Sequence, residues 1–304
     1  MDDFIWENDR IAHRVYGPAL VTGEGTCTAG VDVILKSVHH PVLDTFYKRG
    51  DYHRDHGEGL DCYDVGASQG LGGTVLYDTA TKQWIPAGNF EKWRILESGP
   101  RRAVFELTYP PRLVADTAGA GKLTVTETKT ITVTAGSDFT KITSRFHVTG
   151  GNAKSHFDAA VALLQPTWPN RWKHKRAPFP LLDKTGTGAA AGKPAAAKNP
   201  AATGKAAGNG LYIADWQKNR GDNGFTGVAI VVPGLPHTAP RPEFRNADGH
   251  WLITQRLGPA HASNPRELTL TYYVGAGWSK AWFPTEKSWL DAVRRFAGAG
   301  TGGN

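Results

Sequence analysis

The sequence predicts an all-β protein whose strands pair antiparallel, with one short helix close to its C-terminus. Residues 123–133 alternate β-branched and polar side chains over eleven positions, as expected of a long half-buried strand. After a turn at 135–138, residues 139–148 alternate again, and we expect them to pair back as a hairpin. Only near the C-terminus do apolar residues recur convincingly at helical spacing.

Further strands are predicted along the rest of the chain. Residues 102–109 follow Gly99-Pro100, which is a turn signal. Residues 8–15 carry a pattern that is compatible with a short helical turn. Two to three strands are expected within 28–36 and 71–96, and others at 227–232, 251–256 and 268–274.

The C-terminal helix has a start signal and an apolar stripe. Thr285 can cap its N-terminus, and Glu286 suits the positive end of the helix dipole. The stripe predicts that the helix packs against the sheet through Trp289, Leu290, Val293 and Phe296.

We expect a single domain over residues 1–297. Residues 183–210 are rich in Ala, Gly, Lys and Pro, so we predict a disordered loop inserted into the β domain. Strand-like segments lie on both sides of this insertion, and neither half looks self-sufficient. The glycine-rich residues 298–304 are expected to form a flexible tail.

Composition excludes several classes of function. No run approaches the ~18 apolar residues of a transmembrane helix, so we predict no membrane partner. The net charge is +7 without a dense Lys/Arg run, which suits an anionic substrate better than nucleic acid. The two cysteines form no CxxC pair, which argues against a cysteine zinc site. No signal-peptide pattern follows Met1, so the periplasmic or secreted location that we expect assumes its removal.

The segment 51–63 carries the strongest signal of a polar site. It contains two histidines, two tyrosines and four acidic side chains, and two glycines shape it as a loop. We predict Tyr52, His53 and His56 as catalytic residues, because such groups act as general acids and bases. The carboxylates could instead hold a hard cation such as Ca²⁺, although their spacing does not match the twelve-residue calcium loop; these are Asp55, Glu58 and Asp61. The alternative is a solvated loop.

The N-terminal segment 6–16 supplies candidate substrate-binding residues. Arg10 and Arg14 are four apart, so they would share a face on a helical turn or on a strand, and His13 lies beside them. Two arginines on one face could clamp a carboxylate. A surface ion-pair network with Glu7 and Asp9 is the alternative.

The segment 165–176 interleaves tryptophans with basic groups, and prolines hold it out of regular structure. Trp168 could stack on a sugar ring while Arg171 pairs with an acidic group, with His156 a little upstream. Single-stranded nucleic acid would suit the same pattern, but nothing else in the chain supports it.

Residues 6–18, 52–66 and 99–105 resemble a bacterial family of unknown function found in polysaccharide-degradation loci. That family includes dehydratases that act on uronic-acid-containing ulvan oligosaccharides. The resemblance spans most of the ordered chain and implies a large antiparallel β-sandwich of the galactose-mutarotase-like supersandwich type. It does not indicate which residues are catalytic.

From the resemblance and the residues together we predict a carbon–oxygen lyase without a cofactor, acting on an acidic oligosaccharide. Arg10 or Arg14, with Arg171 in reserve, would neutralise the uronate. His53 or Tyr52 would then remove the adjacent proton, and His56 would protonate the leaving oxygen.

The sequence is also compatible with four other functions: a polysaccharide lyase, a hydrolase that uses Asp55 or Glu58 with Asp61, a mutarotase and a carbohydrate-binding protein. The oligomeric state is not predicted.

Overall fold

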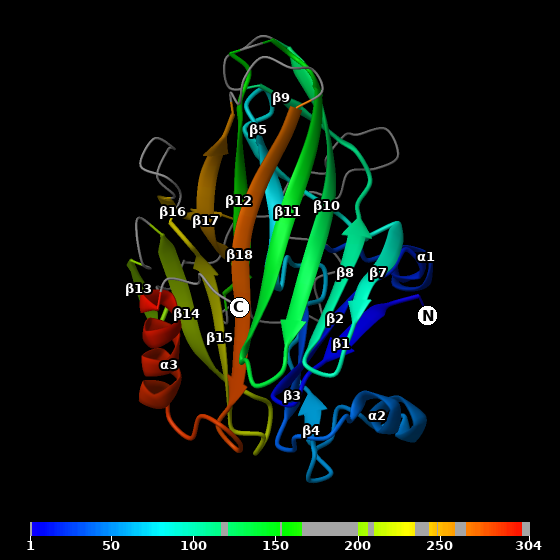
Figure 1. The fold of residues 1–304 in the computed structure, drawn as a ribbon, viewed down its shortest axis with the longest axis vertical. Helices are drawn as coiled ribbons and strands as arrows, with labels where there is room; N and C mark the ends of the chain where they lie inside the picture. Colours follow the sequence, from blue (N-terminus) through cyan, green and yellow to red (C-terminus); the bar gives the residue numbers. More distant parts are fainter. Residues whose placement is uncertain are drawn as a thin grey trace.

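The computed structural model describes residues 2–116, 121–152, 154–165, 200–205, 210–234, 243–247, 249–258 and 266–299. These residues form the predicted all-β, sandwich-like fold, built from three antiparallel sheets, and they include three helices. The longest strands run along most of the height of the molecule, in front of the five-stranded sheet (Figure 1).

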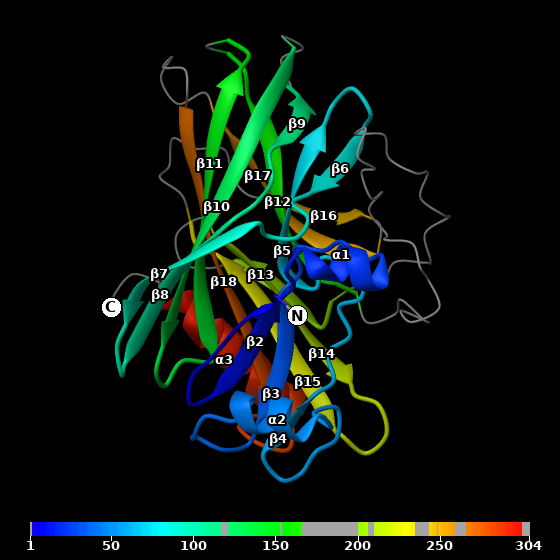
Figure 2. The same ribbon diagram turned by 90° about the vertical axis from the view of Figure 1, so that its right-hand side faces the viewer.

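The largest sheet has nine strands and contains the predicted hairpin. Its strands, in spatial order, are β13 (Ala202–Lys205), β14 (Leu211–Lys218), β15 (Phe225–Val232), β18 (Arg266–Trp278), β11 (Phe139–Gly150), β10 (Lys122–Thr134), β8 (Arg102–Thr108) and β7 (Lys92–Ser98), and β9 (Arg112–Ala115) pairs with β10. The β7–β8 hairpin extends away from the rest of the molecule (Figure 2).

The second sheet has five strands and packs against the inner face of the first. Its order is β16 (Glu243–Ala247), β17 (His250–Leu257), β12 (Phe157–Leu164), β5 (Leu71–Asp78) and β6 (Gln83–Pro86). Alternate residues of both sheets fill the core between them, among them Phe146, Phe157 and Tyr272, which are fully buried. Period-2 alternation therefore produces the sandwich.

The third sheet has four strands and carries the N-terminal segment. It consists of β1 (Phe4–Glu7), β2 (Ile11–Val15), β3 (Asp32–Lys36) and β4 (Gly59–Asp61), in that order. It lies at one end of the molecule, below the five-stranded sheet in the view of Figure 2. One face joins the main core, whereas helix α2 (Leu43–Arg49) covers the other face through Phe46.

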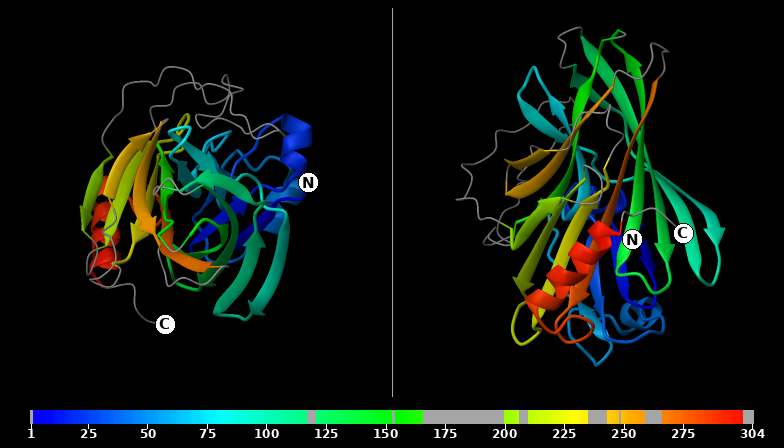
Figure 3. Two further views of the ribbon diagram at one scale, coloured as in Figure 1. Left: turned by 90° about the horizontal axis from the view of Figure 1, so that it is seen from above. Right: turned by 60° about the vertical axis from the view of Figure 1, so that its left-hand side comes forward.

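Helix α3 (Glu286–Gly298) packs on the outer face of the nine-stranded sheet against β14 and β15 (Figure 3). Thr285 accepts a hydrogen bond from the backbone of Ser288, and the Ser288 side chain completes a capping box. Trp289, Leu290 and Val293 are buried as predicted. The helix continues through Gly298, so the predicted tail 298–304 begins one residue too early, and residues 300–304 lie outside the described part.

Three local predictions need correction. Residues 11–15 form strand β2 and not a helical turn, because pairing with β1 and β3 satisfies their backbone. Strand β13 lies inside the predicted disordered insertion 183–210, since its backbone pairs with β14 although its small side chains pack little. The insertion's residues 183–199 lie outside the described part. Two short helices were not predicted, α1 (Ala19–Glu24) and α2.

Within the described residues, no helix is long and apolar enough to cross a membrane.

Candidate functional site

Strand alternation brings four ionisable side chains onto the α2-facing side of the small sheet. Arg14 on β2 lies directly opposite Asp32 on β3, and Ile34, two residues further along β3, lies opposite Asp61 on β4. Tyr16 follows β2 on the same face, because side chains two residues apart point the same way. Tyr47 reaches the group from α2. We call these residues the open cluster: Arg14, Tyr16, Asp32, Tyr47 and Asp61.

Arg14 is the centre of the open cluster. Its Nη2 donates hydrogen bonds to Asp32 Oδ2 at 2.5 Å, to Asp61 Oδ2 at 2.8 Å and to the Tyr16 hydroxyl at 3.1 Å. Its Nη1 donates to the Tyr47 hydroxyl at 3.3 Å. Since only 9% of the side chain is exposed, the guanidinium is engaged by the protein, and the structure shows no free fork for a substrate carboxylate.

Burial and neighbouring charges shift the pKa values of Asp61, Arg14 and Tyr16 in the open cluster. Burial and the neighbouring charge of Asp32 raise the pKa of Asp61 well above its usual range, against the pull of Arg14. Burial alone lowers the pKa of Arg14, but the Asp32 carboxylate and the other neighbours raise it above its ordinary value. Burial, followed by Asp32, raises the pKa of Tyr16. The arginine therefore stays charged.

Two predicted catalytic residues lie at the solvent edge of the open cluster. His53 Nδ1 lies 3.0 Å from the backbone carbonyl of Asp61 and 4.0 Å from its Oδ2. Because the carbonyl can only accept, Nδ1 carries the hydrogen and leaves the Nε2 lone pair available. The His53 side chain is 60% exposed, and the Tyr52 ring packs beside it at 4.5 Å between centroids. Arg14 lies 6.0 Å from the Tyr52 ring centre.

The other polar residues of the loop have separate partners. His56 Nε2 lies 3.4 Å from Asp51, Asp55 lies 4.0 Å from Lys280, and Glu58 binds Arg49 and His40. The three carboxylates proposed for a cation, Asp55, Glu58 and Asp61, thus face different cations. Among the described residues no group of three or more His, Cys, Asp or Glu side chains is arranged to hold a metal ion.

His13 lies on the opposite face of β2 from Arg14, in the core beside Trp6. It is fully buried, and its Nδ1 donates to the Asp32 carbonyl at 3.0 Å. Burial lowers its pKa to about 4, so the ring is neutral. Strand alternation separates this predicted substrate-binding residue from the open cluster, because neighbours in a strand point to opposite faces.

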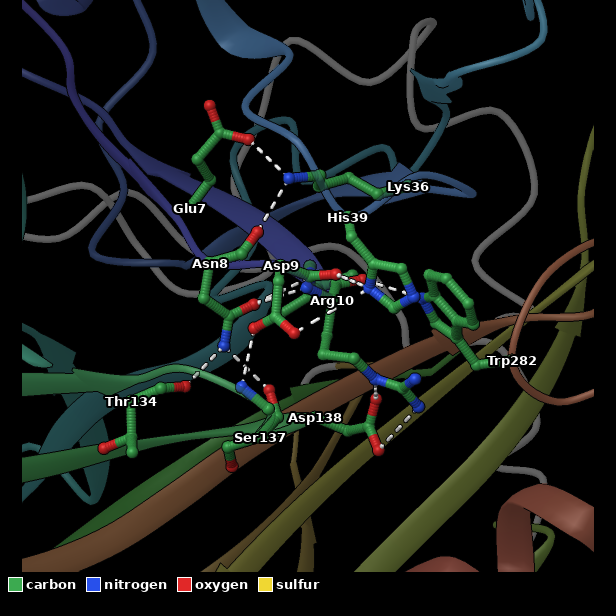
Figure 4. Close-up of polar contacts among 12 residues, drawn as sticks. Glu7, Asn8, Asp9, Arg10, Lys36, His39, Thr134, Ser137, Asp138 and Trp282 are labelled. Atoms are coloured by element: carbon green, nitrogen blue, oxygen red, sulfur yellow. Dashed lines mark hydrogen bonds and ion pairs between the residues drawn. The ribbon is translucent and has the colours of Figure 1, made fainter. Parts of the chain in front are cut away.

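Arg10 is held by a second set of contacts, at the β1–β2 turn (Figure 4). Its Nε donates to Asp138 at 2.9 Å, and its guanidinium lies 4.4 Å from the ring centre of Trp282, on which His39 also stacks. These contacts fix the turn against the β10–β11 hairpin. Arg10 and Arg14 therefore do not converge on one ligand in this structure.

The third predicted segment contributes little to the described structure. Trp168 and Arg171 lie outside the described residues. His156 precedes β12, with Nδ1 at 3.0 Å from the Lys154 carbonyl.

A second charged group lies inside the sandwich. We call it the sealed cluster: Thr74, Tyr109, Arg112, Glu127 and Lys129. Arg112 Nη2 donates to Glu127 at 2.5 Å, and the Thr74 hydroxyl donates to both Glu127 oxygens. Lys129 Nζ lies 4.8 Å from the Tyr109 ring centre and has no hydrogen-bond partner among the described residues. All five side chains are buried.

The cations of the sealed cluster keep the Glu127 carboxylate charged. Although burial raises it, Lys129 and Arg112 hold the pKa of Glu127 below its ordinary value. Burial lowers the pKa of Lys129 to about 8. The sequence alone could have predicted that this charged pair is buried, because Glu127 and Lys129 share the odd-numbered face of β10 with Leu123, Val125 and Ile131.

Sequence reasoning also missed Asp32, Tyr16 and Tyr47 in the open cluster. Asp32 and Tyr47 lie 18 and 33 residues from Arg14, so only the strand register and the placement of α2 bring them together.

Comparison with known proteins identifies the family. The chain belongs to the family described as "Domain of unknown function (DUF4861)", whose model matches residues 1–156. The match includes every residue of both clusters. The chain is also similar to "Uncharacterized protein P7" of Formosa agariphila, with 37% identity over 161 residues, which are 49% of this chain and 38% of that protein. The matched region is thus well under two thirds of that relative, and neither description states an activity.

Proposed function

We propose that the chain is a carbon–oxygen lyase that removes water from uronic-acid-containing oligosaccharides of the ulvan type. The observation that carries the proposal is His53, an exposed imidazole whose Nδ1 is held by the Asp61 carbonyl. Such an arrangement leaves Nε2 to accept a proton from a bound ligand. The resemblance of residues 6–18 and 52–66 to a family that includes oligosaccharide dehydratases supports the same chemistry.

Removal of the proton next to a uronate requires a cation, because charge builds up on the carboxylate as the enolate-like state forms. Arg10 and Arg14 were the predicted cations, but protein carboxylates engage both. Arg54 follows His53 in the same loop and is exposed. We therefore propose Arg54 as the group that neutralises the substrate carboxylate, with Trp168 and Arg171 as further predicted contacts.

Tyr52 stays the alternative base, and its ring supports His53. His56 stays the predicted acid from this loop. The galactose-mutarotase-like form of the sandwich, a catalytic mechanism without a cofactor and a periplasmic or secreted location also belong to the proposal. The sandwich of antiparallel sheets supports the first of these.

Mass spectrometry tests the proposal most simply. The purified protein is incubated with unsaturated uronic-acid oligosaccharides, with ulvan disaccharide among them. A dehydratase yields a product lighter by one water, and His53→Gln should lower that rate by a factor of roughly 10²–10⁴. Arg54→Met should reduce turnover as well, whereas Arg145→Met, an exposed arginine on β11, serves as the matched control.

Other outcomes identify the alternatives. Shorter fragments that have gained water would indicate a hydrolase, and fragments without added water would indicate a polysaccharide lyase. No change in mass across a broad panel of acidic oligosaccharides would contradict the proposal and favour a mutarotase or a binding protein.

A further inference from the structure

The two carboxyl groups on Arg14 have unequal support. Asp32 accepts hydrogen bonds from Arg14 and from the Tyr16 hydroxyl at 2.6 Å, and its Oδ1 accepts one from the backbone of Val33. Among the described residues, the Asp61 carboxyl accepts a hydrogen bond from Arg14 alone. Hydrogen bonds to a carboxylate favour its charged form. Asp32 is therefore the better holder of the negative charge.

The balance of charges in the open cluster also favours a charged Asp32 and a neutral Asp61. One guanidinium can balance one carboxylate, and the exposed fractions of the Asp32 and Asp61 side chains are 1% and 4%. A second buried negative charge without a partner is costly. The raised pKa of Asp61, caused by burial and by Asp32, is consistent with this count.

We propose that Asp61 holds a proton in the resting protein and is the proton donor of the site, and that Tyr16 and Asp32 are positioning residues that keep the proton there. The proposal rests on the proposed function and assigns to Asp61 the role of proton donor that was predicted for His56. The carboxyl lies 4.0 Å from His53 Nδ1, so acid and base occupy one site.

The reaction then balances. The substrate C–H bond breaks, its proton goes to His53 Nε2, and its electron pair forms the new C=C bond. The C–O bond breaks with its electron pair on oxygen, and the leaving hydroxyl takes the proton of Asp61 to become water. The imidazolium of His53 and the carboxylate of Asp61 are left, and transfer of the Nε2 proton to the carboxylate through water restores the site. The substrate has lost one water and no redox partner is needed.

Every packed element contributes titratable groups around Asp61. Arg14 and Tyr16 come from β2 and its end, Asp32 from β3, and Tyr47 from α2. The loop adds Tyr52 and His53, and Asp64 follows β4 with its own partner, Arg220, at 2.9 Å. The charge of Asp64 also raises the pKa of Asp61, by less than the charge of Asp32 does.

Infrared difference spectroscopy tests the protonation without any substrate. A carboxylic-acid C=O band should be present at pH 7 in the wild type and missing in Asp61→Asn. Asp32→Asn should also abolish it, because Asp61 then becomes the only carboxylate on Arg14. Tyr16→Phe should move the pH at which the band disappears down by roughly one unit. Tyr47→Phe is the matched control, since its hydroxyl touches Arg14 but no carboxyl, and it should leave the band unchanged.

The absence of an Asp61-dependent band in the wild type, or its persistence in Asp32→Asn, would overturn the protonation. In the dehydration assay, Asp61→Asn should lose at least about 100-fold, and Tyr16→Phe should move the alkaline limb of the rate profile down. Loss in His56→Gln with full activity in Asp61→Asn would overturn the donor role. A wild type with the band but without dehydration would refute the proposed function and the donor role together, while the band would establish the protonation separately.

Discussion

The open and sealed clusters hold the same kinds of groups in opposite proportions. The sealed cluster places one carboxylate, Glu127, between two cations, Arg112 and Lys129, inside the sandwich. The open cluster places one cation, Arg14, between two carboxyls, Asp32 and Asp61, at the edge of the small sheet. The sealed group fixes its carboxylate in the charged state, whereas the open group leaves one carboxyl with a proton to give.

Access separates the clusters further. Glu127, Arg112 and Lys129 are at most 3% exposed, and Asp61 is nearly as buried, at 4%. His53 is 60% exposed and touches the Asp61 backbone. We infer that the sealed cluster contributes to the structure of the core, and that the open cluster performs chemistry. Removing the central cation of each cluster, and titrating each, tests this contrast.

The largest effect on stability is expected from Arg14→Met. The substitution leaves Asp32 and Asp61 buried without their shared cation, which typically costs about 3–5 kcal/mol. Urea unfolding at pH 7 should show the loss, and it should shrink at low pH as the carboxyls become protonated. A loss below about 1 kcal/mol would mean that the cluster is hydrated and that Arg14 is not its centre.

Lys129→Met sharpens the contrast from the sealed side. Burial lowers the pKa of Lys129 to about 8 from its ordinary value of 10.5, so between these pH values the unfolded chain binds the proton more tightly. This group therefore makes the wild type more stable as pH rises from 8 to 10.5, by about 3 kcal/mol. The variant should lack that rise.

Unfolding curves at the two ends of this window measure the effect. Lys141→Met, which replaces an exposed lysine on β11, should keep the wild-type rise. The same slope in Lys129→Met and the wild type would show that Lys129 is not desolvated.

His13 should produce a similar pH dependence of stability on the acidic side. Its folded pKa of about 4 lies below the ordinary histidine value of 6.5, so the unfolded chain binds the proton first as pH falls. Stability should decrease from pH 6.5 to 4 by about 3 kcal/mol from this residue. His13→Gln should flatten that part of the profile, whereas His147→Gln, at an exposed position on β11, should not. An unchanged profile would place His13 in contact with water.

The smallest effect is expected from Arg10→Met. The ion pair with Asp138 and the contact with Trp282 are partly exposed, so their loss should cost about 1 kcal/mol. Thermal unfolding measures it directly. A cost equal to that of Arg14→Met would remove the distinction between the turn and the open cluster.

The fold was largely predictable, because alternation in β10, β11 and β18 is local information. The same alternation predicts that Glu127 and Lys129 lie in the core, because both are on the odd-numbered, apolar face of β10. The open cluster was only partly predictable. Arg14, Tyr52 and His53 stand out in the sequence, but the opposition of Arg14 and Asp32 depends on the register between β2 and β3. That register is a long-range property of the sheet.

The most direct test of the account compares His53→Gln with the wild type in two assays, the rate of water loss from an unsaturated uronate oligosaccharide and the Tm. The exposed imidazole contributes chemistry and little packing, so turnover should fall at least about 100-fold while the Tm stays within the error of the measurement. Unchanged turnover in His53→Gln, or no water loss by the wild type, would contradict the assignment of catalysis to the open cluster.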